Sequence, residues 1–244
     1  MKALLPACII ALIGIMMPLG STAAQTSESL PDVQSVAKKA IDYLKSQGQN
    51  QENGSYSEFA GPAVTALVTT AMLKHGEGVD DKDVAKSLKY LETFVQPDGG
   101  IYKADSVYKN YETSLAILCF AEANIDGRYD SLIQKAAQYT KGSQWAEGRE
   151  VTESDDRFGG YGYGKHARPD LSNTSYAIDA LLAAGVDPQS VEMQRVLKFV
   201  SRSQNLKSEH NQLPFTSNME KGSEGGFIYT PAGGGETKVE STSV

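Results

Sequence analysis

Apolar residues recur along the chain at helical spacing, in two alternating kinds of segment. In the first kind, the apolar residues step by three and four positions and therefore lie on one face of a helix. Residues 33–44 are the first example, with apolar side chains at Val33, Val36, Ala37, Ala40, Ile41 and Leu44. In the second kind, first met at residues 63–73, apolar residues surround the helix, which indicates burial on most sides. The pattern predicts pairs of helices, one half-exposed and one enclosed.

This pair of helices repeats through the chain, joined each time by a glycine-containing loop. Further half-exposed helices are predicted near residues 81–95, 129–140 and 187–204, and further enclosed helices at residues 110–124 and 173–184. The fourth unit supplies a half-exposed helix and a loop, and the polar sequence after them contains no apolar run for an enclosed helix. The fold class is therefore predicted to be all-α, with seven helices.

Three further features recur at matching places in the units. An aromatic residue near the end of each half-exposed helix precedes a glutamine, and a glycine precedes an aromatic residue in each loop. A threonine opens each enclosed helix. The aromatic–glutamine pairs are Tyr43 and Gln47, Tyr90 and Gln96, Tyr139 and Gln144, and Phe199 and Gln204, and the threonines are Thr65, Thr113 and Thr174. The first two steps between these aromatics exceed the ~34-residue period of common helical-hairpin repeats, which disfavours a generic protein-binding solenoid.

Together these features resemble the prenyltransferase/squalene oxidase repeat of squalene and oxidosqualene cyclases and of protein prenyltransferase β-subunits. The resemblance implies an α/α toroid, here a partial barrel of helical hairpins, with enclosed helices as the inner ring and half-exposed helices as the outer ring. It also implies that the glutamines and loop aromatics tie neighbouring hairpins together. The usual loop tryptophan is Tyr or Phe in this chain. The repeats are expected to occupy residues 25–230, followed by a polar tail at 231–244.

The first 24 residues form a predicted signal peptide. A short basic start, an apolar run from Ala3 to Leu19 and small residues after it predict cleavage after Ala23 or Ala24, and hence a secreted or periplasmic protein. A membrane anchor is the rival interpretation, disfavoured because the run is shorter than the ~20 residues of a membrane span. In the remaining chain Cys119 is alone, within an apolar run, which favours a buried structural cysteine.

Two acidic residues are the candidate catalytic groups. Residues 153–156, Glu-Ser-Asp-Asp, are similar to the Asp-x-Asp-Asp motif of squalene-hopene cyclases, although they lie in a loop where the motif should open an inner helix. Asp155 or Asp156 is the expected proton donor, since clustered carboxylates raise the pKa of the most buried one. Tyr161 and Tyr163 could supply π-faces that stabilise a carbocation. The alternative is a solvated acidic loop without catalytic function.

The loop before the third inner helix is the candidate ligand-binding segment. Tyr161, Tyr163 and His166 lie in it, and the entrances of inner helices face one mouth of a toroid. Asp170, just after this loop, is interpreted as a helix cap. No metal or cofactor is expected, because the three histidines of the chain and Cys119 are not spaced as a ligand set.

The formal net charge of −7 excludes a surface for nucleic acid as the default. The resemblance implies an exported toroid protein that binds a hydrophobic, isoprenoid-like molecule in its central cavity, with squalene-cyclase-like isomerase activity as the most specific form. A prenyltransferase-like transferase is less favoured. The alternative is a non-catalytic secreted toroid that serves as a binding scaffold. A partner chain or a missing C-terminal half is expected to complete the ring, because Val196, Leu197 and Val200 would otherwise be poorly covered.

Overall fold

Inner and outer helices alternate along the chain, as the apolar pattern predicts. The computed structural model describes residues 32–149, 151–217, 224–233 and 235. Within them the α-helices are α1 (Val33–Tyr43), α2 (Pro62–Lys74), α3 (Lys82–Glu92), α4 (Lys109–Ala123), α5 (Asp130–Lys141), α6 (Leu171–Ala183) and α7 (Val191–Arg202). A π-helical turn, Leu44–Gly48, continues α1, and 3-10 turns lie at Glu58–Ala60 and Pro214–Ser217. The described residues contain no extended strand, so the all-α prediction is confirmed.

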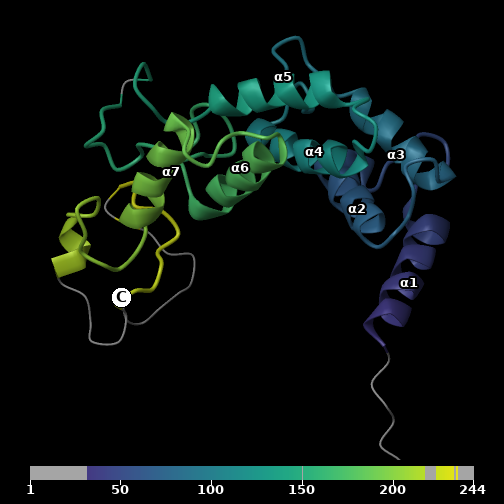
Figure 1. The fold of residues 1–244 in the computed structure, drawn as a ribbon, viewed down its shortest axis with the longest axis horizontal. Coiled ribbons are helices and arrows are strands. Elements are labelled where there is room, and N and C mark those ends of the chain that lie inside the picture. Colours follow the sequence, from purple (N-terminus) through teal and green to yellow (C-terminus); the bar gives the residue numbers. More distant parts are fainter. Residues whose placement is uncertain (1–31, 150, 218–223, 234, 236–244) are drawn as a thin grey trace, which may run out of the picture.

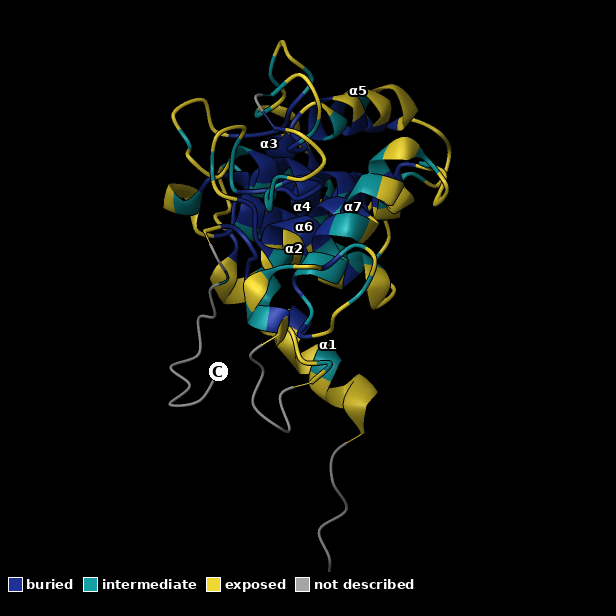
Figure 2. Cartoon of the chain, turned by 90° about the vertical axis from the view of Figure 1, so that its left-hand side faces the viewer, coloured by how far each residue is buried: buried dark blue, intermediate teal, exposed yellow. Residues whose placement is uncertain are grey.

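The helices form two layers along an open arc (Figure 1). Helix α4 packs between α2 and α6 in the inner layer. Each outer helix leans on the inner helix before it: α3 on α2, α5 on α4 and α7 on α6. Helix α1 projects from one end of the arc and is mostly exposed, whereas α4 is mostly buried (Figure 2). The arrangement confirms a toroid-type partial barrel of inner and outer helices.

The predicted signal peptide, residues 1–24, and most of the polar tail lie outside the described residues. At the start of that tail, Pro231 and Ala232 are buried. No helix in the described ranges combines the length and the apolar character needed to cross a membrane.

The threonine at the start of each inner helix holds the preceding loop. The hydroxyl oxygens of Thr65, Thr113 and Thr174 accept hydrogen bonds from the backbone N–H groups of Tyr56, Ile101 and Tyr161, at 2.8, 3.1 and 3.1 Å. All three threonines are fully buried. A buried N–H without a partner is costly, so this bond explains why a hydroxyl recurs inside an apolar helix.

A glycine in each loop lets the next outer helix approach closely. A Cβ atom built on Gly54 or Gly99 would lie 2.6 or 2.8 Å from the carbonyl oxygen of Lys86 or Lys135, and on Gly159 only 1.9 Å from that of Arg195. All three glycines also have φ between +82° and +90°, a conformation that side chains disfavour. We call the contact of a loop glycine with the following outer helix a joint.

Buried glutamines reinforce two of the three joints, and in the first joint the glutamine lies two positions further along than predicted. The Nε2 of Gln49 donates to the carbonyl oxygen of Asp83 at 2.7 Å, and that of Gln144 to the carbonyl oxygen of Glu192 at 2.9 Å. Each acceptor lies at the start of the next outer helix. We call the position from which Gln49 and Gln144 reach the next outer helix the slot. Gln47, the predicted residue, is exposed, because the π-helical turn after α1 adds a residue before the slot.

The sequence position of Gln96 predicts that it ties two hairpins together in the same way, and this prediction is wrong. Its Nε2 donates within its own loop, to the carbonyl oxygens of Phe94 and Tyr102. Val95 occupies the slot of the second unit instead. The backbone register shows this, since the N–H of Gln96 pairs with the Gly100 carbonyl oxygen as that of Trp145 pairs with the Gly160 carbonyl oxygen.

Helix α7 is covered better than expected on one part of its apolar face. Val196 is buried, because the loop at Gly159 packs directly on the backbone beside it. Leu197 is half exposed, as predicted, and Val200 is intermediate. The chain after the fourth loop then returns to the start of α6, where Thr230 Oγ1 donates to the carbonyl oxygen of Pro169 at 2.7 Å.

Candidate functional site

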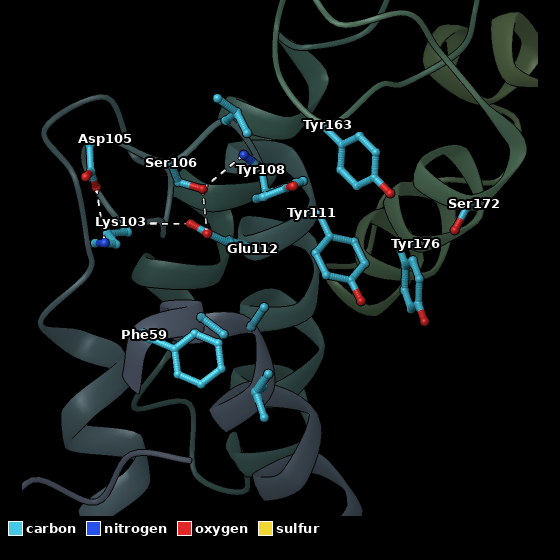
Figure 3. A pocket seen from close by; sticks show the side chains of 14 residues that line it. Phe59, Lys103, Asp105, Ser106, Tyr108, Tyr111, Glu112, Tyr163, Ser172 and Tyr176 are labelled. Atoms are coloured by element: carbon cyan, nitrogen blue, oxygen red, sulfur yellow. Dashed lines mark hydrogen bonds and ion pairs between the residues drawn. The ribbon is translucent and has the colours of Figure 1, made fainter. Parts of the chain in front are cut away.

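A pocket opens where the three inner helices begin (Figure 3). Its volume is about 710 Å³, within the range of small-molecule sites. Its residues occupy matching positions in the repeat: Ala63, Tyr111 and Ser172 each lie two residues before the buried threonine of their helix. The lining also includes Phe59, Lys103, Asp105, Ser106, Val107, Tyr108, Glu112, Tyr163 and Tyr176. The repeat architecture therefore directs three helix entrances into one hollow.

Four tyrosine rings form one wall of the pocket. The ring of Tyr163 contacts those of Tyr108 and Tyr111 edge to face, with centroids 5.0 and 6.2 Å apart. Tyr111 in turn meets Tyr176 of α6 at 5.2 Å, nearly perpendicular. Figure 3 shows Tyr111, Tyr163 and Tyr176 lying along the same side. Edge-to-face packing of aromatic rings is energetically favourable, so these contacts hold the four rings in place.

Asn110 at the start of α4 positions Tyr163. The Asn110 N–H donates to the Tyr163 carbonyl oxygen at 2.8 Å, and its side-chain amide donates to the carbonyl oxygen of Gly162 at 3.0 Å. The loop of the third unit is thereby fastened to the inner helix of the second. Burial raises the pKa of Tyr111, with a further contribution from Tyr176, so its phenol stays neutral.

Glu112 is a buried carboxyl group at the polar end of the pocket. It is 3% exposed, accepts from Ser106 Oγ at 2.6 Å and accepts from the Lys103 N–H at 2.9 Å. Burial raises the pKa of Glu112, although the two hydrogen bonds and the Lys103 charge act in the opposite direction. Glu112 therefore binds its proton more tightly than an exposed glutamate does.

Gly61, just before α2, leaves room for this carboxyl group. A Cβ atom at Gly61 would lie 3.2 Å from Glu112 Oε1, and the residue has φ of +68°. The start of one inner helix thus shapes the space around the acid of the next.

Part of the rim of the pocket is apolar and exposed. Phe59 is 88% exposed and Val107 is 70% exposed. Exposed apolar side chains grouped beside an open pocket are typical of a surface that binds a ligand or partner.

Of the predicted ligand-binding residues, only Tyr163 lines this pocket. Tyr161 is fully buried beneath the third joint, where its N–H bonds Thr174. Burial raises the pKa of the Tyr161 phenol. His166 is exposed and is not among the pocket-lining residues. The sequence places all three in one loop, but the loop turns Tyr161 inward and carries His166 outward.

Asp155 and Asp156 lie in the same loop, near α7 and away from the pocket. The expectation of a raised pKa is wrong for Asp155, because the Arg157 guanidinium that pairs with both its oxygens, at 2.6 to 2.9 Å, lowers that pKa. Asp156 accepts a hydrogen bond from the Gly233 N–H at 3.0 Å. Arg202 donates to the carbonyl oxygen of Asp155. A catalytic role for either aspartate stays a prediction, and the geometry favours Glu112 instead.

Glu112 was missed at the sequence level. The available signal was a charged residue in the first turn of a segment predicted to be enclosed on most sides, since an enclosed carboxyl group is rare without a partner.

Other chemistry-bearing residues do not gather. Among the described residues no three His, Cys, Asp or Glu side chains are placed to hold a metal ion. Cys119 is fully buried in α4, and that burial raises its pKa to about 12, so it is not a nucleophile at neutral pH.

Sequence comparison relates these repeats to known proteins. The model of the squalene-hopene cyclase C-terminal domain matches residues 52–221, which is well over half of the chain. No curated protein matches the chain significantly. The matched region runs from the first loop past α7 and includes the residues that line the pocket. By this match the chain belongs to the squalene-hopene cyclase C-terminal domain family, within the terpenoid cyclase/prenyltransferase repeat superfamily.

Proposed function

We propose that the protein binds a hydrophobic, isoprenoid-like molecule in the pocket at the start of α2, α4 and α6. The observation that carries the proposal is the wall of four tyrosine rings facing a hollow of about 710 Å³. Ligand sites are mostly apolar and aromatic with few polar groups, and this pocket has that composition. The exposed Phe59 and Val107 at the rim would be covered by such a ligand.

We further propose that Glu112 gives the pocket an isomerase activity of the cyclase type. Its protonated carboxyl group would transfer a proton to one carbon of an alkene, the π electrons forming the new C–H bond. The cation on the neighbouring carbon would face the tyrosine rings, whose negative faces stabilise it. Loss of a proton from an adjacent carbon to the Glu112 carboxylate restores the acid and yields an isomer, with no co-reactant.

Ser106 is suited to this cycle because its hydroxyl can donate or accept. It donates to Glu112 Oε1 when that group is ionised, and accepts from the protonated form. The backbone N–H of Tyr108 donates to Ser106 Oγ at 2.9 Å and fixes the hydroxyl oxygen in place.

The binding proposal is tested by titrating the protein with farnesol, an isoprenoid alcohol, and following tyrosine fluorescence. Tyr176→Ala should weaken binding about tenfold or more, because one of the four rings of the wall is removed. Tyr43→Ala is the matched control, since Tyr43 is exposed on α1, outside the pocket. Equal affinities for the two variants would contradict the site assignment.

The isomerase proposal is tested in D₂O with the same isoprenoid. Because the carboxyl proton exchanges with solvent, turnover should place deuterium in the recovered isoprenoid, detected by mass spectrometry. Glu112→Gln should abolish the incorporation while farnesol still binds, whereas Asp155→Asn should leave it unchanged. Binding without incorporation in the native protein would reject the isomerase and favour the second candidate, a non-catalytic binding scaffold that the exposed apolar rim also supports.

We infer that the protein is exported by its N-terminal segment. The support is the sequence alone: a basic start, an apolar run and small residues at positions 21–24. N-terminal sequencing of protein recovered from the medium or periplasm should begin at Ala24 or Gln25. Retention of Met1 would contradict export by cleavage.

A further inference from the structure

The three joints of the chain use matching positions of the outer helix. The carbonyl that meets the loop glycine belongs to Lys86, Lys135 or Arg195, each four residues before the aromatic residue of its helix. The residue that follows this carbonyl is buried in every case, and so is the aromatic itself. The following residues are Ser87, Ala136 and Val196, and the aromatics are Tyr90, Tyr139 and Phe199.

The fourth loop has the backbone of a joint, but no helix of the described residues packs against it. The N–H of Asn205 bonds the Gly226 carbonyl oxygen, and the N–H of Gly225 bonds the Asn205 carbonyl oxygen, at 2.7 and 2.8 Å. Trp145, Gly159 and Gly160 form the same pair of bonds in the third joint. However, a Cβ atom on Gly225 would meet no atom of the described residues within 4 Å. Phe227, the counterpart of the fully buried Tyr161, is 54% exposed.

Helix α1 carries the other half of a joint, also uncovered. Tyr43 corresponds to Tyr90, Tyr139 and Phe199, yet it is 65% exposed. Lys39 stands four residues before it, at the position of Lys86, Lys135 and Arg195, and the next residue, Ala40, is exposed. Figure 2 shows α1 as mostly exposed surface. Figure 1 places α1 and the fourth loop at opposite ends of the arc, so they cannot meet within one copy.

We propose that a second copy of this chain docks its α1 on the fourth loop and completes a joint of the same geometry. Gly225 would receive the backbone carbonyl of Lys39 from the second copy, as Gly159 receives that of Arg195. The interaction is head to tail, because each copy presents α1 at one end and the Gly225 loop at the other. Such an interface generates a closed ring or an open chain of copies.

The third joint also indicates which hydrogen bond the new joint would add. Gln144 Nε2 donates both to the Gly159 carbonyl oxygen of its own loop and to the Glu192 carbonyl oxygen of the next outer helix. Gln204 occupies the same slot and donates to the Gly225 carbonyl oxygen at 3.1 Å. The residue of α1 that corresponds to Glu192, seven before the aromatic, is Val36. Its carbonyl oxygen is the expected second acceptor of Gln204.

In the first and third joints the basic side chain of the outer helix also contacts the loop. Lys86 Nζ donates to the carbonyl oxygen of Gln51 in the first loop at 2.8 Å, and Arg195 pairs with Glu147 of the third loop at 2.6 Å. Lys39 is positioned to donate to the corresponding backbone of the fourth loop, at Leu206.

Sedimentation velocity of the full chain over a concentration series tests the proposal. The native chain should associate as concentration rises, and Ala40→Trp should weaken that association about tenfold or more, because position 40 would be buried in the joint. The substitution leaves one copy intact, since Ala40 is exposed. Lys38→Trp is the matched control, because the corresponding Gln134 and Gln194 are exposed in the second and third joints. Monomer at every concentration up to about 1 mM would overturn the proposal, and so would equal association of the two variants.

Cross-linking tests the head-to-tail orientation. In the third joint a Cβ atom on Gly160 would lie 2.6 Å from the ring of Phe199, so Gly226 and Tyr43 should face each other between copies. Tyr43→Cys and Gly226→Cys are prepared separately with Cys8→Ser, mixed, and treated with a short bismaleimide. Cys119 is buried and does not interfere. A cross-linked dimer is expected only in the mixture. No product in the mixture, or equal product in each variant alone, would overturn this orientation.

Discussion

Replacing one loop glycine by alanine should cost far more stability than replacing its counterpart one repeat later. Gly159 and Gly225 have nearly the same φ, +90° and +83°, so alanine pays the same backbone cost of about 1–2 kcal/mol at both. Only at Gly159 does the new Cβ atom meet another group, 1.9 Å from the Arg195 carbonyl oxygen. Ordinary contact begins at 3.4 Å, so α7 must move by more than an ångström.

That displacement sets the size of the difference. Forcing extra volume into a packed contact costs about 1–3 kcal/mol. Moving α7 also stretches the hydrogen bond from Gln144 to Glu192, worth about 0.5–1.5 kcal/mol. Gly159→Ala should therefore destabilise the protein by about 2–4 kcal/mol more than Gly225→Ala, a large share of the roughly 5–15 kcal/mol that holds a domain folded.

Urea unfolding followed by circular dichroism measures both variants, with the free energies taken from midpoint and slope. The measurement is made on dilute protein, so that contacts between copies do not contribute at Gly225. Equal destabilisation by the two substitutions would refute the close approach of loop and helix. Destabilisation by Gly159→Ala no greater than its backbone cost would refute it as well.

Three further outcomes follow from the buried polar groups. Thr113→Val should cost about 1–3 kcal/mol in urea unfolding, because the Ile101 N–H loses its acceptor; Thr113→Ser should restore most of it, and equal losses would contradict the role of the hydroxyl. Burial raises the pKa of Glu112 in the folded state, so its stabilising contribution is complete below the unfolded pKa and is lost as pH rises through the folded pKa. Glu112→Gln should remove the loss that begins as the pH rises past the unfolded pKa of about 4.3, and a pH profile identical to that of the native protein would count against it. In the Cys8→Ser chain, Cys119 should react with a thiol reagent only in denaturant, as mass spectrometry would show, since the thiol is buried with a pKa of about 12; rapid modification of that folded chain would disprove its burial.

The sequence was sufficient for the layers of the fold because apolar spacing is a local property. Helix α4, which is apolar on most sides, lies in the inner layer, and α3, which is apolar on one face, lies in the outer layer. The recurring threonines were also visible, although their partners, such as the Ile101 N–H, depend on a loop conformation that spacing does not determine.

The register of the joints was harder to predict, because it depends on how each helix ends. Gln47 and Gln49 both follow α1 closely, and only the π-helical turn decides which of them reaches Asp83. The same limit applies to the site. Tyr161 and Tyr163 differ by two residues, yet one is buried in a joint and the other lines the pocket.

Recognition between units through main-chain atoms has a consequence for how such a protein can diverge. At each joint the loop glycine meets the backbone carbonyl of Lys86, Lys135 or Arg195, and two glutamines bind carbonyls as well. A carbonyl oxygen is the same whichever side chain its residue bears. The outward faces of the outer helices can therefore accumulate substitutions freely, while the glycines cannot. One outer helix could be exchanged for another by transplanting its sequence, provided that the residue beside the glycine stays small enough to be buried.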